Sequence, residues 1–400
     1  DTIRRYFEYC GYTVNYISNF TDVDDKIIKA ANEAGISTKE LSDKFIAAFM
    51  EDTGQLGIKP ATQNPRVINY MDEIIAFVST LVDKGFAYVS EGDVYFRVAK
   101  SNNYAKLANK TLEDLEIGAS GRTDAETERK ENPLDFALWK AAKEGEVSWD
   151  SPWGPGRPGW HIECSVMATE ILGDTIDIHG GGADLEFPHH TNEIAQSEAK
   201  TGKTFANYWM HNGFVNVDNE KMSKSLGNFV TVHDMLQTVD GQVLRFFLAT
   251  QQYRKPINFT EKAIHDAEVN LKYLKNTHSL PLTEQVNQAE LQTYLDAFQE
   301  AMDDDFNTAN GVTVLFDMAK WINSGNYDQT VKDAFEKMLQ VFGIVFEEEV
   351  LDEDIEKLIE ERQAARANKD FATADRIRDE LAAQGIKLLD TKEGVRWTRD

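Results

Sequence analysis

The spacing of apolar residues divides the chain into three regions. From residue 1 to about 235, stretches with the three-to-four-residue period of an amphipathic helix alternate with short apolar runs typical of strands. From 236 to 346 the pattern is helical throughout, and from 347 to 400 two helices precede two short strands. This pattern predicts an α/β domain, then an all-α helical bundle, then a small α+β domain.

Within the first region, capping residues and glycines mark the expected elements. A helix that begins at residue 1 should end at Gly11, the run Thr21–Asp25 should cap the next helix, and the capping box Ser37–Glu40 should start a third. Residues 93–133 are expected to be an insertion in the domain, because most of them are polar. Further elements are predicted as strands 14–17, 175–178 and 213–217, a helix over 64–85, and a hairpin of 88–89 with 94–96.

The second and third regions are predicted mainly from helical periodicity. An acidic run at 347–354 is expected to be a linker between them. The predicted elements are helices 243–249, 259–277, 290–302, 312–322, 331–342, 355–367 and 372–383, and a closing hairpin of 386–389 with 395–397.

Composition places the chain among globular proteins of a reducing compartment. It contains 42% hydrophobic residues and only two cysteines, too few for a disulfide framework, so we expect a cytoplasmic protein. No run approaches the roughly 18 apolar residues of a membrane helix. The net charge of −26 argues against nonspecific binding of nucleic acid. It leaves room for a specific RNA partner, because residues 221–255 are locally basic.

Three metal-binding residue types are expected to converge in the centre of the chain. Pro188 suits the first position of a helix, which would place His189 and Glu193 four residues apart on one helix face. Cys164 precedes them by a loop and a strand. A thiolate, an imidazole and a carboxylate together predict a zinc site. His190 is expected to form a local hydrogen bond and not to bind the metal.

A lysine-containing loop, Lys221-Met-Ser-Lys-Ser225, follows the predicted strand 213–217. Lysines on a mobile loop can neutralise the charge that develops on a departing pyrophosphate, since each ammonium is a movable point charge. We therefore expect Lys221 and Lys224 to be catalytic. A solvated surface loop is the alternative that any isolated pair of lysines would favour.

The complete motifs resemble those of cysteinyl-tRNA synthetases. The five-residue lysine loop is the second signature of class I aminoacyl-tRNA synthetases, and the likeness extends over essentially the whole chain. The matching segments are Gly156–Cys164, Asp177–Gly182, Phe187–Glu193, Asn19–Lys26, Ala301–Asn307 and Gly385–Trp397. The resemblance implies a Rossmann-like doubly wound parallel sheet in the catalytic domain, with the helical and C-terminal regions contacting tRNA.

The resemblance also assigns roles to individual residues. Cys164, His189 and Glu193 match three of the family's four zinc ligands, and Lys224 matches the lysine that contacts ATP. The His179-Gly-Gly-Gly182 segment is expected to be a loop at the carboxyl end of a strand, where Gly180, Gly181 and Gly182 let ATP approach the backbone. The residues expected to line the cysteine pocket are Thr21, Trp160, His179 and Asp184. Anticodon contacts are expected from Arg376, Arg396, Trp397 and Arg399.

Two motifs of the family do not occur in the sequence. One is a Tyr-Val-Cys-Gly strand that carries the fourth zinc ligand, and the other is the first class I signature, of the His-Ile-Gly-His type. The chain opens inside a helical pattern, so we expect that roughly one βα unit, on the order of 40 to 50 residues, precedes Asp1 in the full protein.

The expected function is therefore that of a cysteine–tRNA ligase. Such an enzyme activates L-cysteine with ATP and Mg²⁺, uses one zinc ion to select the substrate, and charges tRNA(Cys); the resemblance suggests a monomer. One alternative is a ligase of the mycothiol pathway, which condenses cysteine with an amino-sugar but lacks the anticodon-reading tail. The other is a truncated synthetase-like protein that binds RNA without catalysis.

Overall fold

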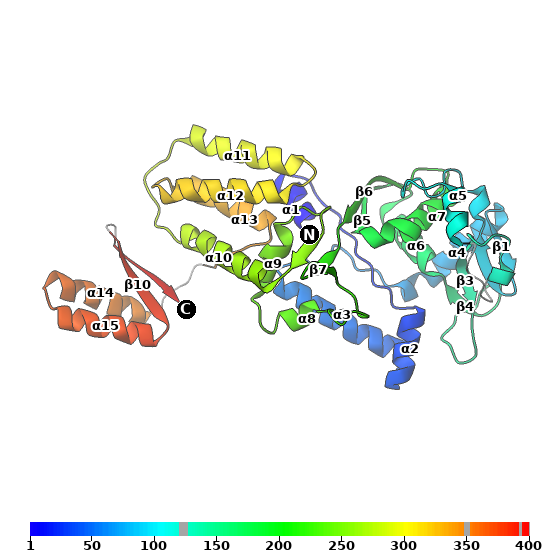
Figure 1. Cartoon of the computed structure of the whole chain (residues 1–400), viewed down its shortest axis with the longest axis horizontal. Coiled ribbons are helices and arrows are strands. Elements are labelled where there is room, and N and C mark those ends of the chain that lie inside the picture. The colour runs from blue at the N-terminus through cyan, green and yellow to red at the C-terminus, as the bar shows by residue number, and fades with distance from the viewer. Residues whose placement is uncertain (120–126, 348–352, 392–393, 400) are drawn as a thin grey trace. The chain divides into compact units, whose positions relative to one another are not determined.

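The chain forms two units, which the computed structural model describes over residues 1–119, 127–347, 353–391 and 394–399. The first unit is Asp1–Val345 and the second is Phe346–Asp400 (Figure 1). The residues of the acidic run 348–352 lie outside the described part of the chain, so the predicted linker is described only at its ends.

The first helices are α1 (Thr2–Tyr9), α2 (Asp25–Ala34), α3 (Thr38–Gln55) and α4 (Met71–Asp83). Of these, α2 and α3 begin where their capping residues predict. The helix predicted over 64–85 begins later than expected, because a short 3-10 turn, Val67–Tyr70, precedes α4. Asp24 caps α2, and Ser37 and Glu40 form the predicted capping box of α3. The predicted strand 14–17 is wrong: the segment makes one isolated bridge, from Ile17 to Gln63, and Phe20 just beyond it makes another, to Arg66. Two bridges are too few for a ladder, so the backbone is extended without being a strand.

The segments that follow build a four-stranded antiparallel sheet, which the sequence pattern did not predict. Its order is β1 (Ala87–Ser90), β2 (Asp93–Phe96), β3 (Phe136–Ala141) and β4 (Gly156–Pro158), and the first pair is the predicted hairpin. Every residue of β2 is buried, although β2 lies in the range expected to be an insertion. Tyr104 and Leu115, the latter on α5 (Leu112–Ala119), also enter this core. Residues 120–126 are outside the described part.

A strand–helix–strand unit holds the central motifs. Strand β5 (Ile176–Gly182) pairs in parallel with β6 (Ala206–Asn212), and α7 (Thr191–Thr201) connects them. Helix α6 (Trp160–Leu172) packs against α7 (Figure 1). The strand predicted at 175–178 continues through His179 and the three glycines, because all of these residues pair with β6. The expected glycine loop is therefore the end of a strand.

A small mixed sheet and a helical bundle complete the first unit. The sheet has the order β8 (Glu220–Lys221), β7 (Val215–Val217) and β9 (Ile257–Phe259), and β7 pairs with β9 in parallel. The predicted helices of the second region are all present, each within a few residues of its expected bounds. They are α9 (Gly241–Ala249), α10 (Glu261–His278), α11 (Gln288–Asp303), α12 (Thr308–Asn323) and α13 (Gln329–Val341), and the short helix α8 (Val232–Met235) precedes them.

The second unit has the predicted order of two helices and a hairpin. These elements are α14 (Glu353–Ala367), α15 (Phe371–Ala383), β10 (Ile386–Thr391) and β11 (Gly394–Arg399). Its own core contains Ile355, Ile377, Leu381 and Ile386. Arg362 is buried beneath the hairpin and donates two hydrogen bonds to Asp390.

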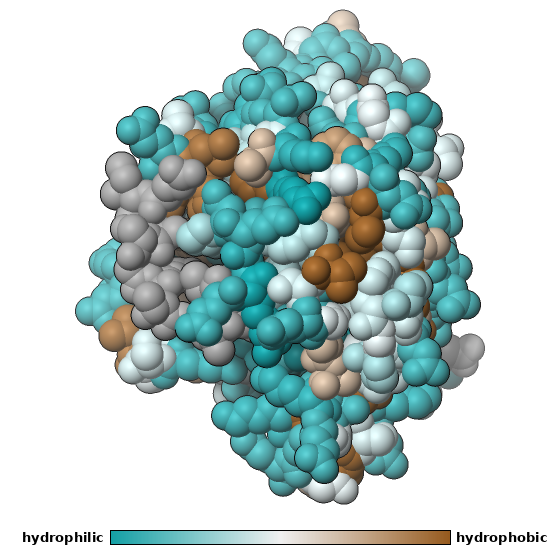
Figure 2. All heavy atoms as spheres, turned by 90° about the vertical axis from the view of Figure 1, so that its right-hand side faces the viewer, coloured by the Kyte–Doolittle hydropathy of each residue, from teal (hydrophilic) through white to brown (hydrophobic). Residues whose placement is uncertain are grey.

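The visible protein surface is polar, in agreement with the 28% of charged residues in the sequence. The face in Figure 2 is mainly hydrophilic and carries small, separate apolar patches. Among the described residues, none of the helices combines the length and the apolar character that crossing a bilayer requires.

Candidate metal centre and lysine loop

The three predicted zinc ligands converge. Cys164 lies in the second turn of α6, His189 lies in the wide turn Glu186–His190, and Glu193 lies in the first turn of α7. One ligand atom from each lies within 4.8 Å of the others. The contact between the two helices includes a hydrogen bond from the Ser165 hydroxyl to the Glu193 carbonyl oxygen, 3.2 Å long. Packing of α6 on α7 therefore brings the thiol to the carboxylate.

The predicted helix start at Pro188 is wrong in detail. The regular helix begins at Thr191, and Phe187 has extended backbone angles inside the preceding turn. His189 still faces Glu193, with Nε2 3.5 Å from Oε2, because the wide turn leads directly into α7. His189 and Glu193 therefore lie close together as expected, although His189 belongs to a wide turn and not to the regular helix.

Glu193 is the centre of a histidine cluster. It is fully buried, and His179 Nε2 lies 3.1 Å from its Oε1 and 3.0 Å from its Oε2. His190 Nε2 lies 3.8 Å from Oε2. His179, His190 and Glu193 form a second group whose ligand atoms lie within 4.8 Å of one another. The carboxylate therefore belongs to two groups of possible metal ligands.

Two further histidines hold the rings that face Glu193. His161 Nδ1 lies 2.9 Å from His189 Nδ1, and His211 Nε2 lies 2.8 Å from His190 Nδ1. These contacts leave the Nε2 atom of each inner ring pointing at the carboxylate. Sequence reasoning missed both outer histidines. His161 lies within the matching segment Gly156–Cys164, three residues before Cys164, which could have drawn attention to it. Only the fold brings His211 close.

Burial sets the protonation of the cluster. It raises the pKa of the Cys164 thiol well above its usual range and lowers the pKa of His161 and of His190 to about 3. Burial alone would also raise the pKa of Glu193, but the charge and hydrogen bonds of His179 outweigh it and hold that pKa below its usual value. Burial opposes the charging of His179, but the Glu193 carboxylate outweighs it and raises the pKa of that ring. Without a metal, the cluster is therefore an anionic carboxylate held by His179, beside neutral His161 and His190 rings and a neutral thiol.

Of the residues predicted to line the cysteine pocket, two touch the cluster. The Trp160 ring lies over His189 with a centroid separation of 4.2 Å and remains 45% exposed, and His179 contacts Glu193 directly. Asp184 is exposed beyond the end of β5. Thr21 lines a different hollow, described next. The Asn19 amide donates to Cys164 Sγ over 3.6 Å, so the segment leading to Thr21 passes the metal centre.

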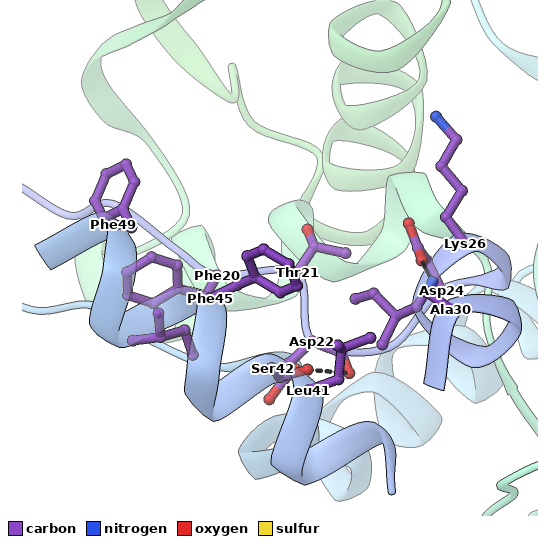
Figure 3. Close-up of a pocket in the computed structure, with 12 residues that line it drawn as sticks. Phe20, Thr21, Asp22, Asp24, Lys26, Ala30, Leu41, Ser42, Phe45 and Phe49 are labelled. Atoms are coloured by element: carbon purple, nitrogen blue, oxygen red, sulfur yellow. Dashed lines mark hydrogen bonds between the residues drawn. The ribbon is translucent and has the colours of Figure 1, made fainter. Parts of the chain in front are cut away.

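The hollow that contains Thr21 lies between α2 and α3 and has a volume of about 380 Å³. Phe20, Phe45 and Phe49 lie along one end of it, and Asp24 and Lys26 lie at the other (Figure 3). Phe45 is 61% exposed, so the aromatic end opens to the surface.

The three predicted ATP-contacting glycines differ in how much space surrounds them. A Cβ atom on Gly181 would lie 2.9 Å from His190 Cε1, and one on Gly182 would lie 2.5 Å from Asp184 Oδ1. On Gly180 it would meet only the Met210 carbonyl oxygen, at 3.5 Å. Gly181 is thus the position where the backbone of β5 approaches the histidine cluster.

The lysine loop lies on the surface beyond β8. Lys221 and Lys224 are both exposed, and each ammonium lies near an aromatic ring: 4.7 Å from the centre of Phe214 and 5.3 Å from that of Phe229, respectively. Asn228 holds the loop through a hydrogen bond from Ser223 N, 2.9 Å long. The loop thus has its own internal bonds, while both lysine side chains remain accessible.

The predicted anticodon contacts all lie in the second unit. Arg376 on α15 is exposed and pairs with Glu380 over 3.5 Å. Trp397 packs against the core of the unit and is half-buried, as is Arg396. The backbone of Arg399 belongs to β11, and its side chain lies outside the described part. Their role in binding RNA stays a prediction.

Comparison with known protein families identifies the fold. Residues 1–269 match the class I (C) tRNA synthetase catalytic domain, residues 297–347 match the DALR domain, and residues 348–397 match the cysteinyl-tRNA ligase anticodon-binding domain. The chain is thus a class I aminoacyl-tRNA synthetase. A methionyl-tRNA synthetase of Mycobacterium tuberculosis, solved with methionyl-adenylate, shares this fold: the TM-score is 0.60 and the identity 15%, over 85% of this chain and 84% of that one.

Sequence relatives define the family more closely. The chain is 95% identical over its full length to the cysteine–tRNA ligase of Streptococcus thermophilus and 82% identical to that of Streptococcus agalactiae, covering 90% of each. The chain belongs to the cysteine–tRNA ligase family. This confirms the predicted fold class and function, and the match at 348–397 favours the tRNA ligase over the amino-sugar ligase.

Proposed function

We propose that the chain selects L-cysteine with one zinc ion held by Cys164, His189 and Glu193, activates it with ATP and Mg²⁺, and transfers it to tRNA(Cys). The observation that carries this proposal is the convergence of these three ligand atoms within 4.8 Å. Their donor set of sulfur, nitrogen and oxygen fits zinc. When bound, zinc supplies a position that a substrate thiolate takes far more readily than a serine hydroxyl.

The surrounding residues orient the ligands and bound the substrate site. His161 fixes the ring of His189 through its Nδ1 atom, which directs Nε2 toward Glu193. Trp160 covers His189 and is 45% exposed, so a small substrate can reach it from solvent. His179 holds the carboxylate of Glu193 in place. We assign cysteine binding to Trp160 and His179, which contact the cluster, and to Thr21 and Asp184, which lie farther from it.

The lysine loop is proposed to serve the activation step. Lys221 and Lys224 leave their aromatic neighbours and approach the phosphates, where they stabilise the charge that accumulates as pyrophosphate departs. Gly180, Gly181 and Gly182 lie at the carboxyl end of β5, where nucleotides bind in sheets of this kind. We assign ATP binding to these glycines and to Lys224.

The remaining regions are proposed to bind tRNA. Residues 1–235 act as the catalytic domain, 236–346 contact the tRNA stem, and 347–400 read the anticodon through Arg376, Arg396, Trp397 and Arg399. Arginine and aromatic side chains are suited to unstacked bases. We further propose that the protein is a cytoplasmic monomer.

The proposal is tested by equilibrium binding of cysteine and serine to the zinc-loaded chain, measured by titration calorimetry. Pocket shape alone discriminates such small differences by roughly 10- to 200-fold, so we expect a larger preference for cysteine in the native chain. In Cys164→Ala the preference should fall into that range. Cys10→Ala, which removes the other, exposed cysteine, is the matched control and should keep the full preference. An unchanged preference in Cys164→Ala would refute the role of zinc.

A further inference from the structure

The histidine cluster around Glu193 contains two sets of ligands, and only one includes the thiol. Cys164 and His189 form one set with the carboxylate, and His179 and His190 form the other. Both sets place their ligand atoms within 4.8 Å of one another. The second set has two imidazoles and one carboxylate, a donor combination that proteins use to hold zinc.

The distances on the second side suit a tetrahedral ion. Ligand atoms about 2.1 Å from a tetrahedral metal are about 3.4 Å from each other. His179 Nε2 lies 3.0 Å and His190 Nε2 lies 3.8 Å from Glu193 Oε2, which bracket that separation. Small movements of the two rings would therefore complete the geometry.

The two inner histidines are also supported in the same way. A metal-binding histidine usually has its other ring nitrogen held by a hydrogen-bond partner, which fixes the ring and its tautomer. His161 provides this support for His189, and His211 provides it for His190, at 2.9 and 2.8 Å. His190 thus has the environment of a ligand although it is not in the set that includes Cys164.

We propose that His179, His190 and Glu193 form a second metal position, which accepts a divalent ion such as Zn²⁺ or Co²⁺ when Cys164 is not available as a ligand. Glu193 is the only carboxylate common to both sets, and its Oε2 faces both His189 and His190. The two positions therefore compete for the same carboxylate oxygen, and the chain binds one ion at a time.

Co²⁺ titration of the full chain tests this proposal, because cobalt reports its ligands by absorption. Co²⁺ bound to a thiolate gives a charge-transfer band in the near ultraviolet, whereas nitrogen and oxygen ligands give only the weaker visible bands. The native chain should bind one equivalent and show the charge-transfer band. Cys164→Ser should still bind one equivalent, without that band.

Variants in the Cys164→Ser background locate the ion. His211→Phe removes only the hydrogen-bond partner of His190 and should weaken Co²⁺ binding by about 10- to 100-fold. His190→Gln removes a ligand of the second position and should weaken Co²⁺ binding by more than that. His189→Gln is the matched control and should leave binding unchanged. Cys164→Ala replaces the serine variant if the latter does not fold, as judged by circular dichroism.

The proposal is overturned if the Cys164 variants bind no Co²⁺, if His190→Gln leaves their binding unchanged, or if His189→Gln weakens it as much as His190→Gln does. The proposed role of Cys164 as a zinc ligand is tested separately. Its failure would appear as a native chain that binds Co²⁺ without the charge-transfer band.

Discussion

The metal centre and the lysine loop hold their charged groups in opposite ways. Glu193 is fully buried and is fixed by His179 before any ligand binds. Lys221 and Lys224 are exposed and rest on aromatic rings, at contacts that cost little to break. Recognition of one atom in the substrate needs fixed geometry, whereas charge that appears only during the reaction can be met by groups that move. The two regions should therefore respond differently to substitution.

The largest effect is expected from Lys224→Ala. Loss of one group that stabilises transition-state charge lowers rates by about 10²- to 10³-fold, so cysteine-dependent pyrophosphate exchange should fall by that factor. The midpoint of thermal unfolding should not change, because the side chain is exposed. Lys262→Ala on α10, another exposed lysine, is the control and should alter neither quantity. A large drop in the unfolding midpoint of Lys224→Ala would contradict the comparison.

Acid should weaken the metal-free histidine cluster. The pKa values of His161 and His190 are lowered to about 3 in the folded chain, whereas the unfolded value is about 6.5. Between these values the unfolded chain binds more protons than the folded chain. The free energy of unfolding therefore decreases as the pH is lowered, by up to about 1.4 kcal/mol per pH unit for each histidine.

Urea unfolding of the metal-free chain at several pH values measures this slope. His190→Phe should make it shallower between pH values of about 6.5 and 4. The exposed His265, replaced by Gln, is the control and should leave the slope as it is. An identical slope in His190→Phe and the native chain would show that burial of this ring does not control the acid response.

Gly181→Ala is expected to have a smaller effect on the same side. Its Cβ atom would lie 2.9 Å from His190, and overpacking of this kind costs about 1–3 kcal/mol. Gly180→Ala is the matched control, since its Cβ atom meets only a carbonyl oxygen at 3.5 Å. Urea unfolding of both variants compares them. Equal stability of the two variants would mean that the end of β5 adjusts to the added methyl group and is not rigidly packed against His190.

The smallest effect is expected from Phe229→Leu. The aromatic contact of Lys224 stabilises the resting loop by about 0.5–1 kcal/mol. Its removal frees the lysine, so the KM for ATP should fall by about two- to fivefold. Val232→Ala, at an exposed position on α8, is the control and should leave the KM for ATP unchanged. A buried phenylalanine such as Phe205 is unsuitable as a control, because its replacement would disturb the core. A higher KM in Phe229→Leu would mean that the ring helps to bind ATP.

The sequence allowed prediction of the elements and of the converging ligands to different extents. Periodicity and caps located the helices of both units because these signals are local. The four-stranded antiparallel sheet was not predicted as a whole. Its strand β4 has only three residues, Gly156–Pro158, which are too few to show an alternating pattern. The glycines of β5 suggested a loop, but pairing with β6 stabilises them as a strand.

The candidate site shows the same division. Motif resemblance brought Cys164, His189 and Glu193 together, and the structure agrees in placing them close. The outer partners His161 and His211 are 50 residues apart in the numbering, and no periodic pattern links them. Their pairing with adjacent histidines depends on how α6, α7 and β6 pack, which is tertiary information.

The second unit has its own core of Ile355, Ile377, Leu381 and Ile386, closed by the Arg362–Asp390 pair. A segment with an independent interior can be expressed by itself or exchanged between proteins without rebuilding its host. We therefore expect that the second unit, which is proposed to read the anticodon, can be moved onto another synthetase, and that specificity for a tRNA can evolve separately from specificity for an amino acid.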